Sequence, residues 1–168
     1  GNTVWVGTGE ANACGSGCIA GVGIYKSTDG GDTWSGPIGQ AEFGSRGVGS
    51  IAVKPGDPNT IYAATTRAGR SASSVVSGGV TTLIPGAAMW GLYKSTDGGA
   101  SWAFIHNGAA LASDCPASLT STGSNATPCS PRGVRRVAVD PADPNTVYAG
   151  SYARGIWRSS DGGATPKT

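Results

Sequence analysis

Three aspartates stand in near-identical surroundings, and a carboxylate repeated in this way could serve acid–base catalysis, metal binding or turn geometry. The stretch "GIYKSTDGGDTW" at 23–34 returns as "GLYKSTDGGASW" at 91–102 and as "GIWRSSDGGATP" at 155–166. A catalytic carboxylate needs a specific partner within a cleft rather than three equivalent copies. One carboxylate among glycines also supplies too few oxygens for calcium. The pattern therefore predicts a structural role at a tight turn.

The residue types of this motif predict how the turn closes. The two glycines after each aspartate can take the positive φ of a tight hairpin. The carboxylate can accept backbone N–H groups across the turn, and the serine hydroxyl can add a hydrogen bond. A tryptophan follows in the first two copies, where we expect it to pack over the hairpin, but Pro166 replaces it in the third. The residues predicted to form these structural turns are Ser27, Asp29, Gly31 and Trp34, then Ser95, Asp97, Gly99 and Trp102, then Ser159, Asp161 and Gly163.

A second module alternates with the first. The stretch "IAVKPGDPNTIYAAT" at 51–65 is matched by "VAVDPADPNTVYAGS" at 137–151, and the opening "NTVWVGTGE" matches its last part. Each module alternates apolar and polar residues around Asp-Pro-Asn or Asp-Gly-Gly, which predicts antiparallel strand pairs and almost no helix. We name the strands of one repeat A, B, C and D. The chain then reads B-C-D, A-B-C-D and A-B-C, or ten strands.

This repeat predicts an all-β fold of antiparallel four-stranded propeller blades, about two and a half of them. We expect one propeller segment over 1–168, with a partial blade at 1–40, a blade at 47–107, an inserted loop at 108–132 and a partial blade at 133–168. Propellers have about four to eight blades, so we expect a piece of a longer protein. A short open-ended assembly is the alternative, because its exposed edge strands would favour association.

The motif resembles the Asp-box, or BNR repeat, whose pattern is Ser-x-Asp-x-Gly-x-Thr/Ser-Trp. The stretches "VDPADPNTVYAG" and "GIWRSSDGG" are similar to bacterial secreted BNR-repeat proteins around the xyloglucanase-type glycoside hydrolases, and more distantly to sortilin-like and sialidase propellers. The resemblance covers nearly the whole chain outside its long loops and implies a propeller. It selects no function, because the box occurs in enzymes and non-enzymes alike.

The enzymes of this family carry signatures that the chain does not match. In xyloglucanase-type enzymes the catalytic acids are two aspartates from distant parts of a large chain, and neither can be placed on this sequence. Sialidases use three clustered arginines, a Tyr–Glu pair and an Arg-Ile-Pro signature, and no such arrangement is visible here. Sialidase activity is therefore disfavoured.

Blade topology indicates where a ligand should bind. In an antiparallel blade the A–B and C–D turns lie at one end, and the B–C and D–A connections lie at the other. Every insertion falls at this second end, which we call the loop-rich end: "ANACGSGCIAGV", "GPIGQAEFGSRG", "AGRSASSVVSGGVTTLIPGAAMW" and "NGAALASDCPASLTSTGSNATPCSPRG". Elaborated loops on a rigid scaffold commonly carry binding sites, so we expect the ligand there.

Several side chains at the loop-rich end are candidates for function. A glycosidase needs two carboxylates about 5–9.5 Å apart, and Glu10 with Asp114 is the pair to test. The alternative is that these polar residues are only solvated loop residues. The candidate ligand-binding residues are Arg67, Arg70, Trp90, His106, Arg132, Tyr152 and Arg154.

The four cysteines form two local pairs, Cys14 with Cys18 and Cys115 with Cys129. Their spacing differs from the Cys-x-x-Cys of most structural zinc sites, and the chain has a single histidine, so we expect loop disulfides and no metal. Disulfides favour an exported, extracellular or cell-surface protein. Three connectivities remain open.

Composition narrows the partners further. The net charge of +2 is too small and scattered to indicate nucleic acid. No apolar run approaches the roughly 20 residues of a membrane span, and nothing indicates a cofactor. Three functions remain: a recognition or structural module that binds glycan or protein, part of a polysaccharide hydrolase, and a subunit that associates through open blade edges. The expected partners are accordingly a glycan or protein ligand, further blades of the same parent chain, or another copy.

Overall fold

The computed structural model describes residues 1–12, 19–67, 74–77, 80–83, 88–106, 133–151 and 155–165, with the backbone alone for 67, 74–77 and 80–83. Within these ranges the one helix is the short α1 (Gln40–Phe43). The strands are β1 (Val4–Gly7), β2 (Ile24–Ser27), β3 (Ser35–Ile38), β4 (Arg46–Lys54), β5 (Asp57–Arg67), β6 (Ser74–Ser77), β7 (Val80–Leu83), β8 (Leu92–Ser95), β9 (Ala103–His106), β10 (Val134–Val139), β11 (Val147–Ser151) and β12 (Ile156–Ser159).

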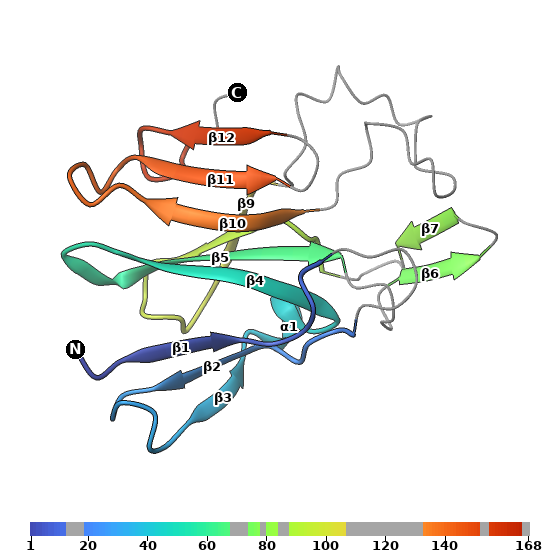
Figure 1. Ribbon diagram of the computed structural model, residues 1–168, viewed down its shortest axis with the longest axis horizontal. Coiled ribbons are helices and arrows are strands. Elements are labelled where there is room, and N and C mark those ends of the chain that lie inside the picture. Colours follow the sequence, from blue (N-terminus) through green and yellow to red (C-terminus); the bar gives the residue numbers. More distant parts are fainter. Residues whose placement is uncertain are drawn as a thin grey trace.

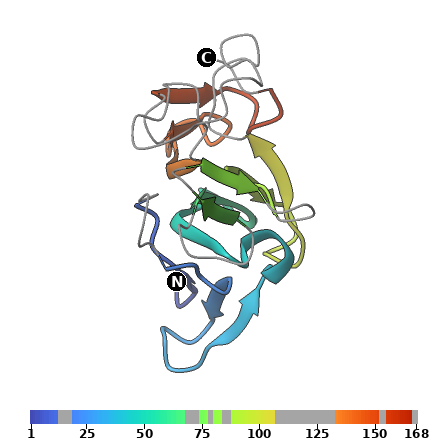
Figure 2. The same cartoon turned by 90° about the vertical axis from the view of Figure 1, so that its right-hand side faces the viewer.

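The strands form three main antiparallel sheets, in the orders β1-β2-β3, β4-β5-β8-β9 and β10-β11-β12. These are the predicted B-C-D, A-B-C-D and A-B-C units, so the all-β blade architecture is confirmed. The four-stranded sheet lies between the other two, and β4 contacts both β1 and β10 (Figure 1). A view turned by 90° shows the same succession from the N-terminal to the C-terminal sheet (Figure 2).

The prediction of ten strands was wrong in one place. The segment between β5 and β8, expected to be a plain connection, contains the hairpin β6–β7 at the loop-rich end (Figure 1). Its sequence "SVVSGGVTTL" carries the signal: two short runs rich in β-branched residues separated by Gly-Gly.

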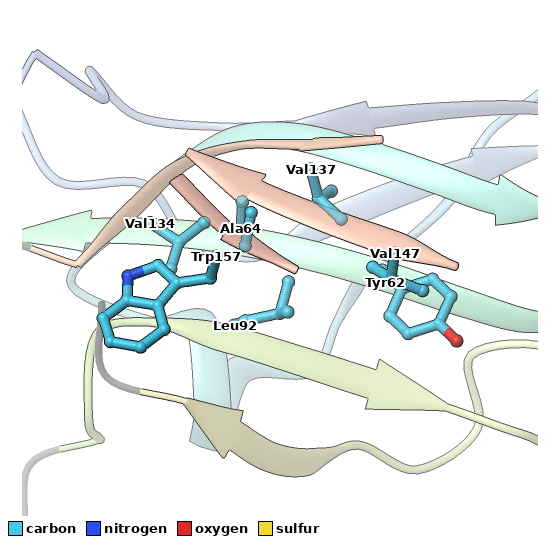
Figure 3. Packing of buried hydrophobic residues seen from close by; sticks show 8 residues of the cluster. Tyr62, Ala64, Leu92, Val134, Val137, Val147 and Trp157 are labelled. Carbon is cyan, nitrogen blue, oxygen red and sulfur yellow. The ribbon is translucent and has the colours of Figure 1, made fainter. Parts of the chain in front are cut away.

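The core lies between adjacent sheets and is set by the alternation of β5. Tyr62 and Ala64 face β10–β12 in a cluster that includes Leu92 and Trp157 (Figure 3). Ile61 and Ala63, the alternate residues, pack in a second cluster with residues of β2, α1 and β4. Both faces of the central sheet are thus buried, which explains why 61–66 is apolar or Thr with no exposed member.

The two kinds of turn meet at the same end of each blade. The first glycine of every Asp-Gly-Gly donates its N–H to the carbonyl of an Asp-Pro-Asn or N-terminal asparagine. The pairs are Gly30–Asn2 at 2.8 Å, Gly98–Asn59 at 3.0 Å and Gly162–Asn145 at 2.7 Å. This places the A–B and C–D turns together and leaves the loop-rich end opposite them.

Neighbouring blades are joined through a contact that we call the inter-blade clasp: an aromatic residue on strand B and a cation on strand C hold the Gly-Gly turn of the next blade. Between the second and third sheets, the Tyr62 hydroxyl and Lys94 Nζ both donate to the Gly162 carbonyl, each at 2.9 Å. Between the first two sheets, Lys26 Nζ lies 3.3 Å from the Gly98 carbonyl and 4.7 Å from the Trp5 ring.

The third blade carries the same pair without a neighbour in the described part of the chain. Tyr148 pairs with Arg158 in the register in which Tyr62 pairs with Lys94. Tyr148 is 38% exposed, whereas Tyr62 is fully buried. The outer face of the last sheet therefore presents the residues that form a clasp elsewhere in the chain.

Candidate functional site

The turn aspartates are held by local hydrogen bonds. The Ser27 hydroxyl donates to Asp29 Oδ1 at 2.6 Å and accepts from the Gly31 N–H at 2.9 Å. The Thr33 N–H donates to Oδ1 at 2.9 Å, and its hydroxyl donates to Oδ2 at 2.5 Å. The same set recurs around Asp97 and Asp161, with Ser101 and Thr165 in the place of Thr33.

These hydrogen bonds stabilise the ionised carboxylates. Donation from Ser101 and Ser95 lowers the pKa of Asp97 to about 2, and the pKa values of Asp29 and Asp161 lie well below the usual range, chiefly through Ser27 and Ser159. Such weakly basic carboxylates, with both oxygens occupied, suit turn geometry rather than proton transfer at neutral pH. The hydroxyl residue two positions after Gly-Gly (Thr33, Ser101 or Thr165) also belongs to the turn, and the residues predicted from the sequence did not include it.

The two turn tryptophans have different surroundings. Trp34 Nε1 donates to the Gly31 carbonyl at 2.9 Å, so this ring lies over its own hairpin, and 44% of it is exposed. Trp102 is only 9% exposed because the Phe43 ring packs edge-on against it, with centroids 4.9 Å apart. Another segment of the same chain therefore covers the tryptophan of the second hairpin, whereas that of the first hairpin stays exposed.

Glu10 lies at the loop-rich end but binds its own loop. Its Oε2 accepts from the Ile19 N–H at 2.9 Å, and its backbone N–H donates to the Ile19 carbonyl at 2.9 Å. Its backbone also passes close to Gly47, where an added Cβ would be 2.5 Å from the Glu10 carbonyl oxygen. One oxygen of the Glu10 carboxylate therefore stabilises the connection between β1 and β2 by accepting from Ile19.

Trp90 is half-buried against a cation. The guanidinium of Arg46 lies 5.1 Å from its ring centroid and donates to the carbonyls of Ser45 and Ala88. Burial lowers the pKa of Arg46 to about 10, still above neutral pH. One face of Trp90 is thus already in contact with protein, which reduces its value as a stacking platform for a sugar.

His106 ends β9 and packs on Trp157, with ring centroids 4.2 Å apart. Burial lowers its pKa below the ordinary 6.5, which favours the neutral ring. The adjoining cavity, lined mainly by apolar side chains such as Leu92 and Val147, has a volume of about 20 Å³. This is room for about one water molecule, too little for a sugar.

Of the remaining candidates, Arg67 is described by its backbone, which pairs with Arg46 at the end of β5. The other candidates lie outside the described residues: Asp114, Arg70, Arg132, Tyr152, Arg154 and the four cysteines Cys14, Cys18, Cys115 and Cys129.

An open cavity of about 520 Å³ lies at the loop-rich end, beside the inner strands β4 and β10. It is lined by Ala11, Asn12, Gly49, Arg135 and Arg136. Arg135 Nη2 donates to Asn12 Oδ1 at 3.2 Å, and both arginines are exposed. Sequence reasoning missed Arg135 and Arg136 because they lie within a predicted strand rather than a loop.

Two general features bear on what the chain could bind. Across the described ranges, no three His, Cys, Asp or Glu side chains gather in a way that could hold a metal ion. No helix in the same ranges has the length and hydropathy to cross a bilayer.

The chain resembles a stretch of a xyloglucanase. It is 27% identical over 149 residues to the xyloglucanase of Hypocrea jecorina (strain QM6a), covering 85% of this chain and 14% of that enzyme. No family model matches the chain.

Two solved structures share the fold. An ancestral GH74 enzyme superposes with a TM-score of 0.52 at 24% identity, over 86% of this chain and 15% of that one. The GH74 xyloglucanase from Xanthomonas campestris superposes with a TM-score of 0.50 at 25% identity, over 86% and 17%. The chain therefore spans about one-sixth or less of the length of these relatives.

Proposed function

We propose that the chain is part of an extracellular Asp-box (BNR) propeller that recognises a glycan at its loop-rich end. The observation that supports this is the open cavity beside β4 and β10, whose volume falls within the roughly 300–1,000 Å³ of small-molecule sites. The similarity to xyloglucanases adds a polysaccharide as the class of ligand. A protein ligand is the other form of the same recognition role.

Glycan binding is tested by titrating the intact chain with neutral and acidic oligosaccharides in a calorimeter. Saturable heat with at least one oligosaccharide, reduced by substitution of cavity residues, supports the proposal. Absence of binding to every glycan, together with capture of a protein ligand at the same end, would replace it with protein recognition.

A polysaccharide hydrolase is the second candidate, favoured by the similarity to the xyloglucanase. Glu10 and Asp114 are the carboxylates proposed for it. Release of reducing ends from xyloglucan, abolished by Glu10→Gln or Asp114→Asn, would support hydrolysis. Because Glu10 braces its loop through Ile19, Glu10→Gln also needs a fold check by circular dichroism.

The outer face of the third sheet supports a proposal about assembly. Tyr148 and Arg158 repeat the residues of the inter-blade clasp, and Ile156 beside them is 74% exposed. We propose that this face receives the Gly-Gly turn of a further blade, from the same parent chain or from another copy. Sedimentation equilibrium of the chain, with and without Tyr148→Glu, measures association through this face.

Export is proposed with two loop disulfides, Cys14–Cys18 and Cys115–Cys129. Intact mass after alkylation, before and after reduction, counts the free thiols. Four free thiols in protein recovered from the native host would reject the disulfides and with them the main argument for an extracellular location.

A further inference from the structure

The same β-bulge occurs on the inner strand of two successive blades. Between β4 and β5 the register passes from Val48↔Thr65 to Ser50↔Ala64, which leaves Gly49 as the extra residue. Between β10 and β11 it passes from Val134↔Ser151 to Arg136↔Gly150, which leaves Arg135 as the extra residue. The bulge belongs to the scaffold, because it recurs at the matching position of the repeat.

The bulge changes where two neighbouring side chains lie. In a regular strand, consecutive side chains point to opposite faces of the sheet. A bulge interrupts that alternation and re-aims a side chain. Arg135 and Arg136 accordingly line one cavity although they are adjacent in sequence. Gly150, the cross-strand partner of Arg136, adds no side chain that would compete for the space.

The residues at the bulge differ between the blades in a way that the scaffold does not require. The second blade has Gly49 and Ser50 where the third has Arg135 and Arg136. Gly49 has no room for a side chain, since an added Cβ would lie 2.7 Å from the Ala11 Cβ and 2.8 Å from the Arg135 carbonyl oxygen. One blade thus supplies a close-packed wall and the next supplies two cations.

The charge of this cavity is not neutralised within the described ranges. None of the five lining residues is acidic, and neither guanidinium forms an ion pair with a described carboxylate. Asn12 accepts from Arg135 through Oδ1, which leaves its amide nitrogen as a further donor. The two charged groups that the structure describes at this site are therefore both donors, which matches an acceptor-rich anion.

We propose that Arg135 and Arg136 bind the carboxylate of a uronic acid residue in an acidic polysaccharide. The guanidinium is a planar fork of donors that matches a carboxylate in a bidentate manner. A neutral sugar offers hydroxyl groups but no anion to pair with two cations. This inference rests on the proposed glycan-binding function and names the class of glycan.

The experiment compares three ligands in calorimetric titrations of the intact chain: trigalacturonate, its fully methyl-esterified form, and a neutral xyloglucan heptasaccharide. The ester keeps the sugars and removes the charge. The key variant combines Arg135→Gly with Arg136→Ser, the residues that the second blade carries at the same bulge, so the fold is expected to accept them. Lys54→Gln is the matched control, because it removes a cation at the A–B turn end of β4, where Lys54 contacts Asn145 and does not line the cavity.

We expect trigalacturonate to bind at least about tenfold more tightly than its ester, and the double variant to lose at least about tenfold in affinity. Lys54→Gln should change affinity less than about twofold, and added salt should weaken the wild-type interaction. Equal binding of acid and ester, or unchanged affinity in the folded double variant, would overturn the uronate assignment. If either of these overturning results is found and the neutral heptasaccharide still binds, the uronate assignment fails, but the proposed glycan recognition is retained. If none of the three binds, the glycan-binding function falls together with this inference.

Discussion

Tyr62→Phe tests the inter-blade clasp with the loss of a single oxygen atom. The Tyr62 side chain is fully buried between the second and third sheets, and its hydroxyl donates to the Gly162 carbonyl at 2.9 Å. Phenylalanine fills the same space with the same ring. The substitution therefore removes one hydrogen bond without opening a large cavity.

The expected cost follows from what remains at the carbonyl. Loss of a hydrogen bond costs about 1 kcal/mol, and more when a buried partner is left unsatisfied. Lys94 Nζ still donates to the Gly162 carbonyl at 2.9 Å, so the oxygen keeps one donor. Tyr62→Phe should therefore lower the free energy of unfolding by about 1 kcal/mol and Tm by about 2–4 °C for a chain of this length.

Urea unfolding, followed by tryptophan fluorescence, measures this difference. Tyr148→Phe is the matched control, because it removes the equivalent hydroxyl from the third blade, where the residue is 38% exposed. The control should leave the free energy of unfolding within about 0.5 kcal/mol of the unsubstituted chain. Its behaviour separates the clasp from a general effect of losing a tyrosine.

The double variant with Lys94→Met sharpens the test. Each single substitution leaves one donor at the Gly162 carbonyl, whereas both together remove its two described side-chain donors. The double variant should exceed the sum of the single effects by about 1 kcal/mol or more, because a buried carbonyl then loses its partners. Additive effects, or equal effects of Tyr62→Phe and Tyr148→Phe, would refute the clasp as the contact that joins these blades.

Three further predictions concern the turns and the half-buried imidazole of His106. Gly99→Ala should lower the free energy of unfolding by about 1–3 kcal/mol more than Gly30→Ala. Both glycines have positive φ, but only a Cβ at position 99 would meet the Trp5 ring, at 2.7 Å. Equal urea midpoints for the two variants would contradict this prediction. The Asp97 pKa is lowered from 3.8 to about 2 in the folded chain, so its stabilising effect is complete above about pH 4 and is lost as the pH falls through 2. Urea midpoints at successive pH values should therefore fall across this window, and Asp97→Asn should flatten that fall. Burial lowers the pKa of His106 below 6.5, so its contribution is complete above pH 6.5 and is lost as the ring is protonated at lower pH; an NMR titration midpoint above 6.5 would contradict this.

The blade architecture could be predicted because its determinants are local. The residues that shape each C–D turn fall within seven consecutive positions, as in Ser27 to Thr33. Strand alternation then places Tyr62 and Ala64 on one face and Ile61 and Ala63 on the other. Neither feature depends on contacts between distant segments.

Contacts between blades could not be predicted in the same way. Trp34 and Trp102 occupy the same position of the repeat, yet one is 44% and the other 9% exposed, because Phe43 from the preceding connection covers only the second. The motif determines the hairpin itself, whereas segments outside the motif, such as the connection that carries Phe43, determine how far its tryptophan is buried. The sequence could equally not show that Lys94 reaches a carbonyl 68 residues away.

The candidate site illustrates both the use and the limit of comparing repeats. Glu10 was selected as a carboxylate at the loop-rich end, but the structure shows it bound to the Ile19 N–H of its own loop. A comparison of the repeats along their inner strands would have found Arg135 and Arg136 where the second blade has Gly and Ser. Strand alternation nevertheless predicts opposite faces for adjacent arginines, and only the observed register reveals the bulge that brings them to one cavity. Variation between repeats therefore selects positions that the scaffold leaves open, while pairing geometry decides which of them can act together on a ligand.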